Sequence, residues 1–240
     1  MRGPVAGNLA IPRRWPNPIR LNNTVLEVTF DGHQRPYRHV ISRTRLLVEG
    51  TRAEGTPYVA TRVGHEGAFV AHFTKNGDQI PTVVDLLVDH HHNAALGVER
   101  CYSGLATRPF SVHTLRGSLG PFTVNNLLGG AGSQQYPRHL TITLDGDTRT
   151  WTLELSPLGR IKSWRRDTNA PARFGQGRIM HAAHNTDLLI WEHPTGTGAF
   201  FLDSKSSTFF GTVFFTHEHG DPTDTPVTGN FLFSTETHPA

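Results

Sequence analysis

The chain has one cysteine, little charge and no long hydrophobic run. Cys101 is the only cysteine among 240 residues, which excludes an internal disulfide and a cysteine-rich zinc module. No run approaches the roughly 20 apolar residues that span a bilayer, and residues 1–18 lack the apolar stretch of a secretory signal. These absences predict a cytoplasmic protein that does not contact a membrane.

The charge that is present is balanced and scattered. Charged residues make up 18% of the chain, and 23 Lys and Arg against 20 Asp and Glu give a net charge of +3 with the 15 histidines neutral. The basic residues occur as isolated pairs such as Arg13-Arg14 and Arg165-Arg166, without the clustering of a phosphate-binding face. We therefore expect no nucleic-acid partner.

Alternation of apolar and polar residues, the pattern of half-buried strands, dominates the sequence. Turn signals such as Asp31-Gly32 and Asp145-Gly146 separate the runs and leave little room for helices. This pattern predicts an all-β fold. The runs are VLEVTF (25–30), TRLLVE (44–49), GAFVAHF (67–73), HLTITLD (139–145), TWTLELS (150–156) and DLLIWEH (187–193).

An internal repeat divides the chain in two. VTFDG at 28–32 recurs as ITLDG at 142–146, and LLVDHHHNAALG at 86–97 recurs as FFLDSKSSTFFG at 200–211, both 114 residues later. GAFVAHF and DLLIWEH fall 120 apart, which aligns Phe73 with His193. We expect an N-terminal arm (1–20) and two antiparallel β-barrels in tandem (21–131 and 132–240), the alternative being one larger barrel or sandwich.

Short stretches of the chain resemble two known families. Residues 191–197 (WEHPTGT) and 199–215 resemble a hairpin and strand of the phenolic acid decarboxylases, calycin-like barrels that cleave hydroxycinnamic acids without a cofactor. The two-copy pattern, in residues 57–73, 87–97 and 180–194, resembles the MoaF-type proteins. The resemblance implies two calycin-like (lipocalin-like) segments, the first MoaF N-terminal-like and the second MoaF C-terminal-like, with no cofactor.

The resemblance also implies a set of reacting residues. His193 stands where the decarboxylases have a glutamate that handles the proton, and Thr141 and Thr143 stand where they have two tyrosines. Arg173 is the best counterpart of the family's arginine, and Arg178 is the next. His193 would then exchange a proton with the substrate, while Arg173, Thr141 and Thr143 hold a developing oxyanion.

Aromatic and aliphatic residues near His193 offer a binding wall. The period of two places Leu189, Trp191 and His193 on one face of their strand. With Trp151 and Phe200, Leu189 and Trp191 would form an apolar surface for a ligand. Ordinary core packing is the alternative for these side chains, and for His193 a hydrogen bond to a backbone carbonyl.

The histidine clusters give no firm metal site. His90-His91-His92 lies in a hairpin where the second copy has Ser204-Lys205-Ser206, which predicts a solvated turn. His217 and His219 share a strand face in the run THEHGD, so zinc binding by these two histidines is left as an alternative. We predict no bound metal elsewhere.

Two functions follow from these patterns. The first is a cofactor-independent lyase or isomerase that acts by acid/base catalysis on a small apolar or aromatic metabolite, by decarboxylation, dehydration or double-bond migration. The second is a non-catalytic, lipocalin-like binding or accessory protein for a hydrophobic small molecule. The expected partner in both cases is a small hydrophobic or aromatic molecule, and the sequence leaves a homodimer open.

Overall fold

The protein consists of β-strands arranged in two antiparallel units, which confirms the predicted all-β fold with two tandem barrels. The computed structural model describes residues 21, 23–32, 36–43, 45–49, 55–63, 67–74, 80–104, 109–120, 135–145, 150–166, 171–174, 176–183, 185–216 and 223–235, with only the backbone at 67–74, 174 and 183. These ranges hold no helix that could span a membrane.

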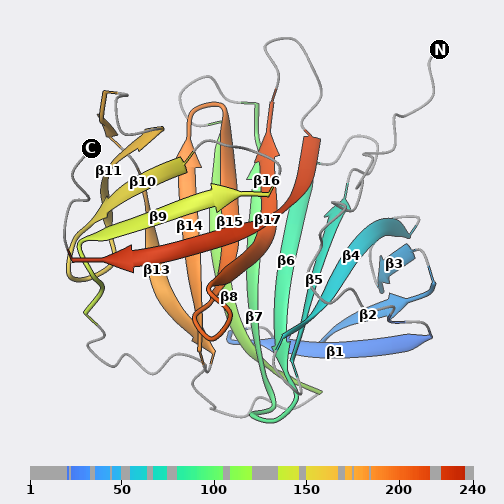
Figure 1. Ribbon diagram of the computed structural model, residues 1–240. Helices are drawn as coiled ribbons and strands as arrows, with labels where there is room; N and C mark the ends of the chain where they lie inside the picture. The colour runs from blue at the N-terminus through green and yellow to red at the C-terminus, as the bar shows by residue number, and fades with distance from the viewer. Residues whose placement is uncertain are drawn as a thin grey trace.

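The first unit is a closed barrel in which each strand pairs with the next and β8 pairs back to β1 (Figure 1). Its tight turns include the one between β6 and β7, where the chain reverses at residues 90–93. The strands are β1 (Thr24–Phe30), β2 (Tyr37–Ile41), β3 (Arg45–Val48), β4 (Thr56–Val63), β5 (Gly67–Thr74), β6 (Thr82–Asp89), β7 (Ala94–Tyr102) and β8 (Phe110–Leu119).

The second unit is a nine-stranded sheet in the order β12-β11-β10-β9-β17-β16-β15-β14-β13. Its edge strands β12 and β13 are consecutive in the chain and are separated only by position 175. An Ile179 N–H to Gly159 carbonyl bond of 2.8 Å also ties β13 to the start of β11, so the sheet is nearly closed. The strands are β9 (His139–Leu144), β10 (Thr150–Leu155), β11 (Ile161–Arg166), β12 (Arg173–Phe174), β13 (Gln176–Ala183), β14 (Thr186–His193), β15 (Gly196–Asp203), β16 (Thr208–Phe215) and β17 (Thr223–Ser234).

The strand registers support the repeat and correct one alignment. The β6–β7 and β15–β16 hairpins match at the predicted offset of 114, which equates Asp89 with Asp203. Asp89 pairs with Gly67 and Asp203 pairs with Thr186, so β5 and β14 match at an offset of 119. The offset of 120 was therefore wrong by one residue, and Thr74, not Phe73, occupies the position of His193. A slip of one residue moves every side chain of a strand to the opposite face.

Each barrel has an apolar interior built by alternation. In the second barrel Leu140 and Ile142 of β9 point inward, as do Leu153 of β10 and Leu189 of β14, and all four are buried. The interior of the first barrel holds Val28, Phe30 and Leu86 among others. Burial on this scale is the main stabilising term of the fold.

The outer faces of the two barrels pack against each other. Leu96 and Val98 of β7 contact a surface that includes Ile190 of β14 and Phe201 of β15, and all four side chains are at most 2% exposed. In Figure 1 the strands β6 and β7 stand next to β14, β15 and β16. Strand β7 is therefore buried on both faces, whereas a strand of an isolated barrel would expose one.

Candidate functional site

A cavity of about 210 Å³ lies inside the second barrel. Cavities of roughly 150 Å³ with apolar walls accommodate one benzene ring, so this volume suits a ring with a substituent. The wall is entirely apolar or aromatic and comes from β9, β10, β11, β14, β15 and β16. The lining residues are Ile142, Leu144, Trp151, Leu153, Trp164, Leu189, Trp191, Phe200 and Val213.

The four residues that the sequence predicts for ligand binding all line this cavity. Leu189 and Trp191 alternate inward along β14, and Phe200 lies directly opposite Leu189 on β15. Trp151 enters from β10 on the far side of the barrel. Residues up to 49 positions apart in the chain thus meet around one space.

Three indole rings form one end of the cavity. Trp151 and Trp164 are stacked with ring centroids 5.1 Å apart, and Trp191 meets both edge-on at 6.4 and 6.2 Å. Stacked and edge-on arrays give planar apolar ligands favourable faces to contact. Trp164 was not predicted from the sequence. The alternation of its strand, IKSWRR, gives no clear inward position, because a register shift interrupts the pairing of β10 with β11.

His193 borders this aromatic group. Its ring stacks on Trp191 at 5.6 Å and meets Trp164 edge-on at 6.2 Å. Its Nδ1 accepts the Thr195 backbone N–H at 3.3 Å and lies 2.8 Å from the Thr195 hydroxyl oxygen. The bond from the Thr195 N–H requires a lone pair on Nδ1 and so favours the neutral tautomer with its hydrogen on Nε2, whereas donation from Nδ1 to the Thr195 hydroxyl would require the other tautomer. Partial burial, reinforced by the charge of Arg173, lowers the pKa of His193, which favours this neutral form.

Two arginines lie over the rings of Trp151 and Trp164. Arg166 lies directly across from Trp151 and Arg173 directly across from Trp164 in neighbouring strands. Their guanidinium carbons lie 5.6 and 5.5 Å from the respective ring centroids, which is cation–π distance. Arg173, the predicted oxyanion holder, is thus next to the cavity, and Arg166 joins it.

Two buried donors at this end have no acceptor. The indole Nε1–H of Trp151 and the Nε–H of Arg166 are shielded from solvent and find no hydrogen-bond partner within the described ranges. A buried donor without a partner costs about 1–3 kcal/mol. An oxygen atom of a ligand that reached this point would supply the acceptor.

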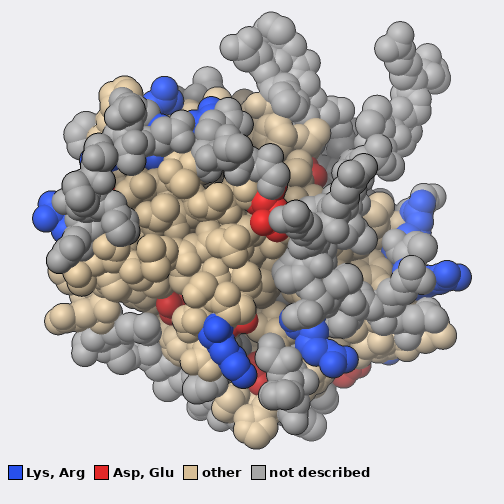
Figure 2. Space-filling view, viewed as in Figure 1, with Lys and Arg blue, Asp and Glu red and all other residues tan. Residues whose placement is uncertain are grey.

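The predicted role of Thr141 and Thr143 is wrong in its geometry. Ile142 and Leu144 of the same strand line the cavity, so alternation turns both threonines to the outer face of the barrel. There they lie across from Thr152 and Thr150 of β10. Figure 2 shows that the face formed by β9 and β17 is largely uncharged. Neither hydroxyl can reach a ligand inside the barrel.

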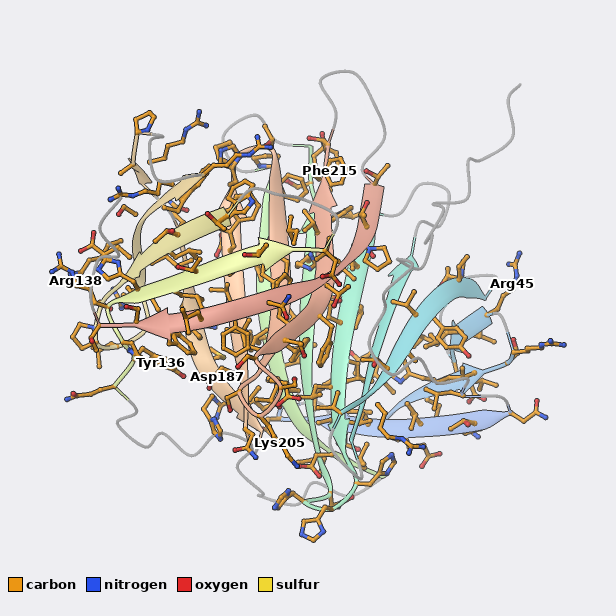
Figure 3. The ribbon with its side chains drawn as sticks, in the orientation of Figure 1. Arg45, Tyr136, Arg138, Asp187, Lys205 and Phe215 are labelled. Atoms are coloured by element: carbon orange, nitrogen blue, oxygen red, sulfur yellow. The ribbon has the colours of Figure 1, made fainter. Side chains whose placement is uncertain are left out.

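A polar cluster lies at the other end of β14. The hydroxyl of Tyr136 donates to Asp187 Oδ1 at 3.4 Å, and both residues are labelled in Figure 3. His181 Nδ1 lies 3.3 Å from the same oxygen. Burial raises the pKa of Asp187, although His181 opposes the shift. Asp187 is the second residue of β14, which ends at His193, so this cluster is separated from the cavity rim and does not join it.

The other sequence candidates do not converge on the cavity. Arg178 faces the first barrel and donates to Thr114 Oγ1 at 3.1 Å. His90, His91 and His92 form the turn between β6 and β7, and His217 and His219 lie outside the described residues. Within the part of the chain that is described, no three His, Cys, Asp or Glu side chains are grouped as metal ligands would be.

Comparison with known proteins adds no assignment. No family model matches the chain, and no curated protein matches it. The resemblance to MoaF-type proteins and to phenolic acid decarboxylases therefore stays a prediction.

Proposed function

We propose that the second barrel binds a small planar apolar molecule that carries an anionic or hydrogen-bond-accepting end. The carrying observation is the 210 Å³ cavity walled by three tryptophans next to two unpartnered buried donors. The ring of the ligand would lie against Trp151, Trp164 and Trp191. The Nε1–H of Trp151 and the guanidinium of Arg166 lie behind the apolar wall and would turn toward the oxygen atoms of the ligand when it binds.

The state of His193 favours binding over base catalysis. A general base needs a free lone pair directed at the substrate. In the tautomer that the Thr195 N–H favours, the lone pair of neutral His193 is on Nδ1 and is already used by that N–H, and Nε2 carries a hydrogen. His193 therefore serves best as a donor to a ligand oxygen, together with Arg173. This argument places the binding role ahead of the lyase or isomerase role.

Fluorescence titration with benzoate and toluene tests the proposal. The two molecules share a ring, but only benzoate supplies an acceptor and a charge. We expect both to quench tryptophan emission saturably and benzoate to bind more tightly. Arg166→Gln should weaken benzoate binding by about tenfold, equivalent to ~1.4 kcal/mol, and leave toluene binding unchanged.

The control variant is Arg165→Gln. Arg165 carries the same charge one position earlier, but it lies across from Thr152 on the outer face of the barrel. Its replacement should leave both affinities as in the unaltered protein. If neither molecule produces saturable quenching, or if Arg165→Gln and Arg166→Gln behave alike, the proposed site is wrong.

A second candidate is the cofactor-independent lyase or isomerase. The observation in its favour is the Nε2–H of His193, a proton donor stacked on a wall residue of the cavity, Trp191. In D₂O a decarboxylase or a double-bond isomerase of this type would place deuterium in its product, whereas a dehydratase would give a product lighter by one water, and mass spectrometry would detect either change. His193→Gln should abolish either change. If the ligand is recovered unchanged after long incubation with the unaltered protein, the protein binds the ligand and does not convert it.

A further inference from the structure

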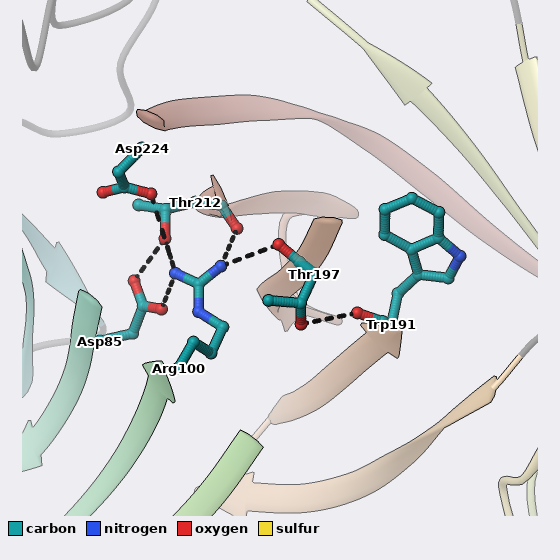
Figure 4. Close-up of polar contacts among 6 residues, drawn as sticks. All are labelled: Asp85, Arg100, Trp191, Thr197, Thr212 and Asp224. Atoms are coloured by element: carbon teal, nitrogen blue, oxygen red, sulfur yellow. Dashed lines mark hydrogen bonds and ion pairs between the residues drawn. The ribbon is translucent and has the colours of Figure 1, made fainter. Parts of the chain in front are cut away.

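Three charged side chains are buried where the barrels meet. Asp85 of β6 and Arg100 of β7 come from the first barrel, and Asp224 of β17 comes from the second (Figure 4). Their side chains are 0%, 0% and 1% exposed, respectively. Ions taken out of water cost several kcal/mol each unless they are paired and hydrogen-bonded. The charge balance of this group therefore matters.

Arg100 and Asp85 are well paired. Arg100 Nη2 donates to Asp85 Oδ2 at 2.5 Å and also to Thr212 Oγ1. Its Nη1 donates to the carbonyl oxygens of Thr197 at 3.1 Å and Thr212 at 3.0 Å. The Thr212 hydroxyl in turn donates to Asp85 Oδ1 at 2.8 Å. Both carboxylate oxygens of Asp85 thus accept a hydrogen bond, which stabilises its ionised form.

Asp224 lacks this support. Its Oδ1 lies 3.9 Å from Arg100 Nη2, and neither of its oxygens has a hydrogen-bond partner at bonding distance in the described part of the chain. The single positive charge is already neutralised by Asp85. Burial raises the pKa of Asp224 to about 7, and the negative charge of Asp85 adds to the shift, while Arg100, the Thr212 hydroxyl and the Thr225 backbone N–H oppose it.

We propose that Asp85, Arg100 and Asp224 form a proton-binding site at the junction of the barrels, with one proton held on Asp224. With that proton bound, the group is neutral: one guanidinium, one carboxylate and one carboxylic acid. When the proton leaves, a second carboxylate stays buried without a counter-charge. The contact between the barrels is then weakened. This inference does not depend on the proposed ligand.

Among the residues that the structure describes, no other charge near Asp224 would replace the proton. The charged groups that face Asp224 are Arg100 from β7 and Asp85 from β6. Strands β15 and β16 contribute Thr197 and Thr212, which are uncharged. Burial raises the pKa of Asp85 as well, but Arg100 and Thr212 counteract the shift, so the proton belongs on Asp224.

The sign of the pH effect follows from linkage. In the unfolded chain an aspartate ionises near pH 4, whereas folded Asp224 stays protonated up to about 7. Between these values unfolding releases a proton, so the folded state loses stability as pH rises. The unfolding equilibrium constant should grow by up to about tenfold per pH unit from this group, and the growth should stop above about pH 7.

The experiment is urea unfolding of the full chain at a series of pH values from 5 to 8. Asp224→Asn, an uncharged isostere of the protonated acid, should lack this growth of the unfolding constant. Asp85→Asn should also lack it, because Arg100 then has only Asp224 to pair with and holds it ionised. Asp31→Asn, at an exposed turn, should keep the pH dependence of the unaltered protein.

Side-chain carboxyl ¹³C NMR of the unaltered protein gives a second readout that needs no variant to fold. The resonance assigned to Asp224 should titrate near pH 7. The inference is overturned if that resonance titrates below pH 5, or if Asp224→Asn retains the pH dependence of the unaltered protein.

Discussion

At the scale of single residues, His193 shows how a strand end tunes one imidazole. The turn that follows β14 places the Thr195 N–H on Nδ1, and Arg173 faces the ring from β12. The first contact favours the tautomer with hydrogen on Nε2, and the second disfavours the charged form. The sequence predicted the neighbours Leu189 and Trp191, because they follow from a period of two. It did not predict the tautomer, which depends on a turn geometry that spacing alone does not specify.

We predict that His193 titrates below pH 6.5, because burial and Arg173 both lower its pKa. Its folded-state pKa lies below the unfolded value, so its contribution to stability is present above about pH 6.5 and is lost as pH falls. Histidine-selective NMR would measure the midpoint. Arg173→Gln should raise it toward 6.5, and a midpoint at or above 6.5 in the unaltered protein would contradict the assigned environment.

At the scale of strands, alternation decided which predictions succeeded. The repeat predicted the β6–β7 and β15–β16 hairpins at the correct offset, because short tight turns leave no room for drift. Thr141 and Thr143 were placed by resemblance to a family motif, although Ile142 and Leu144 between and after them already marked the inward face. The offset between β5 and β14 was predicted wrongly by one residue, because the loops on either side of these strands differ in length between the two copies and do not fix the alignment.

A glycine on β15 sets the volume of the cavity. A Cβ atom at Gly198 would lie 2.5 Å from Phe200 Cζ, so Gly198→Ala must displace the Phe200 ring, which lines the cavity. We expect a loss of about 1–3 kcal/mol in the free energy of unfolding and weaker benzoate binding. Urea unfolding and fluorescence titration would measure both.

Gly97→Ala on β7 is the matched control. Its added Cβ would lie 3.2 Å from Phe30 Cζ in the first barrel, away from the cavity. This variant should lower stability and leave benzoate affinity unchanged. Equal losses of affinity in both variants would show that Gly198 acts through general stability.

At the scale of the whole molecule, the two barrels form one structural unit. Phe201 of β15 is fully buried against the first barrel, and Arg100 of β7 is fully buried against the second. Sequence reasoning missed Arg100 because VERCY on its own reads as a strand with one solvent face. Only the packing of two barrels buries the second face of β7, and a repeat in sequence does not specify how its copies dock.

Separated barrels should therefore not be stable. Residues 21–131 alone would expose Leu96 and Val98, and residues 132–240 alone would expose Ile190 and Phe201. We predict that each half, expressed separately, shows no cooperative unfolding by circular dichroism, whereas the full chain unfolds in one transition. Two stable halves with separate transitions would contradict this expectation.

Phe201→Ala in the full chain tests the same contact without truncation. Deleting a fully buried aromatic ring should cost about 3–5 kcal/mol of unfolding free energy. Because the two barrels share this junction, the protection of backbone amides against hydrogen exchange should fall in both barrels. A loss confined to the second barrel would show that the two units are independent.

The most direct test of the binding site is a crystal structure of the protein soaked with 4-iodobenzoate. The anomalous signal of iodine locates the ligand independently of how well its ring fits the electron density. We predict one iodine peak within the second barrel among Trp151, Trp164 and Trp191, with the carboxylate toward Arg166. A cavity that stays empty at saturating ligand, or iodine bound only on the outer surface, would contradict the account.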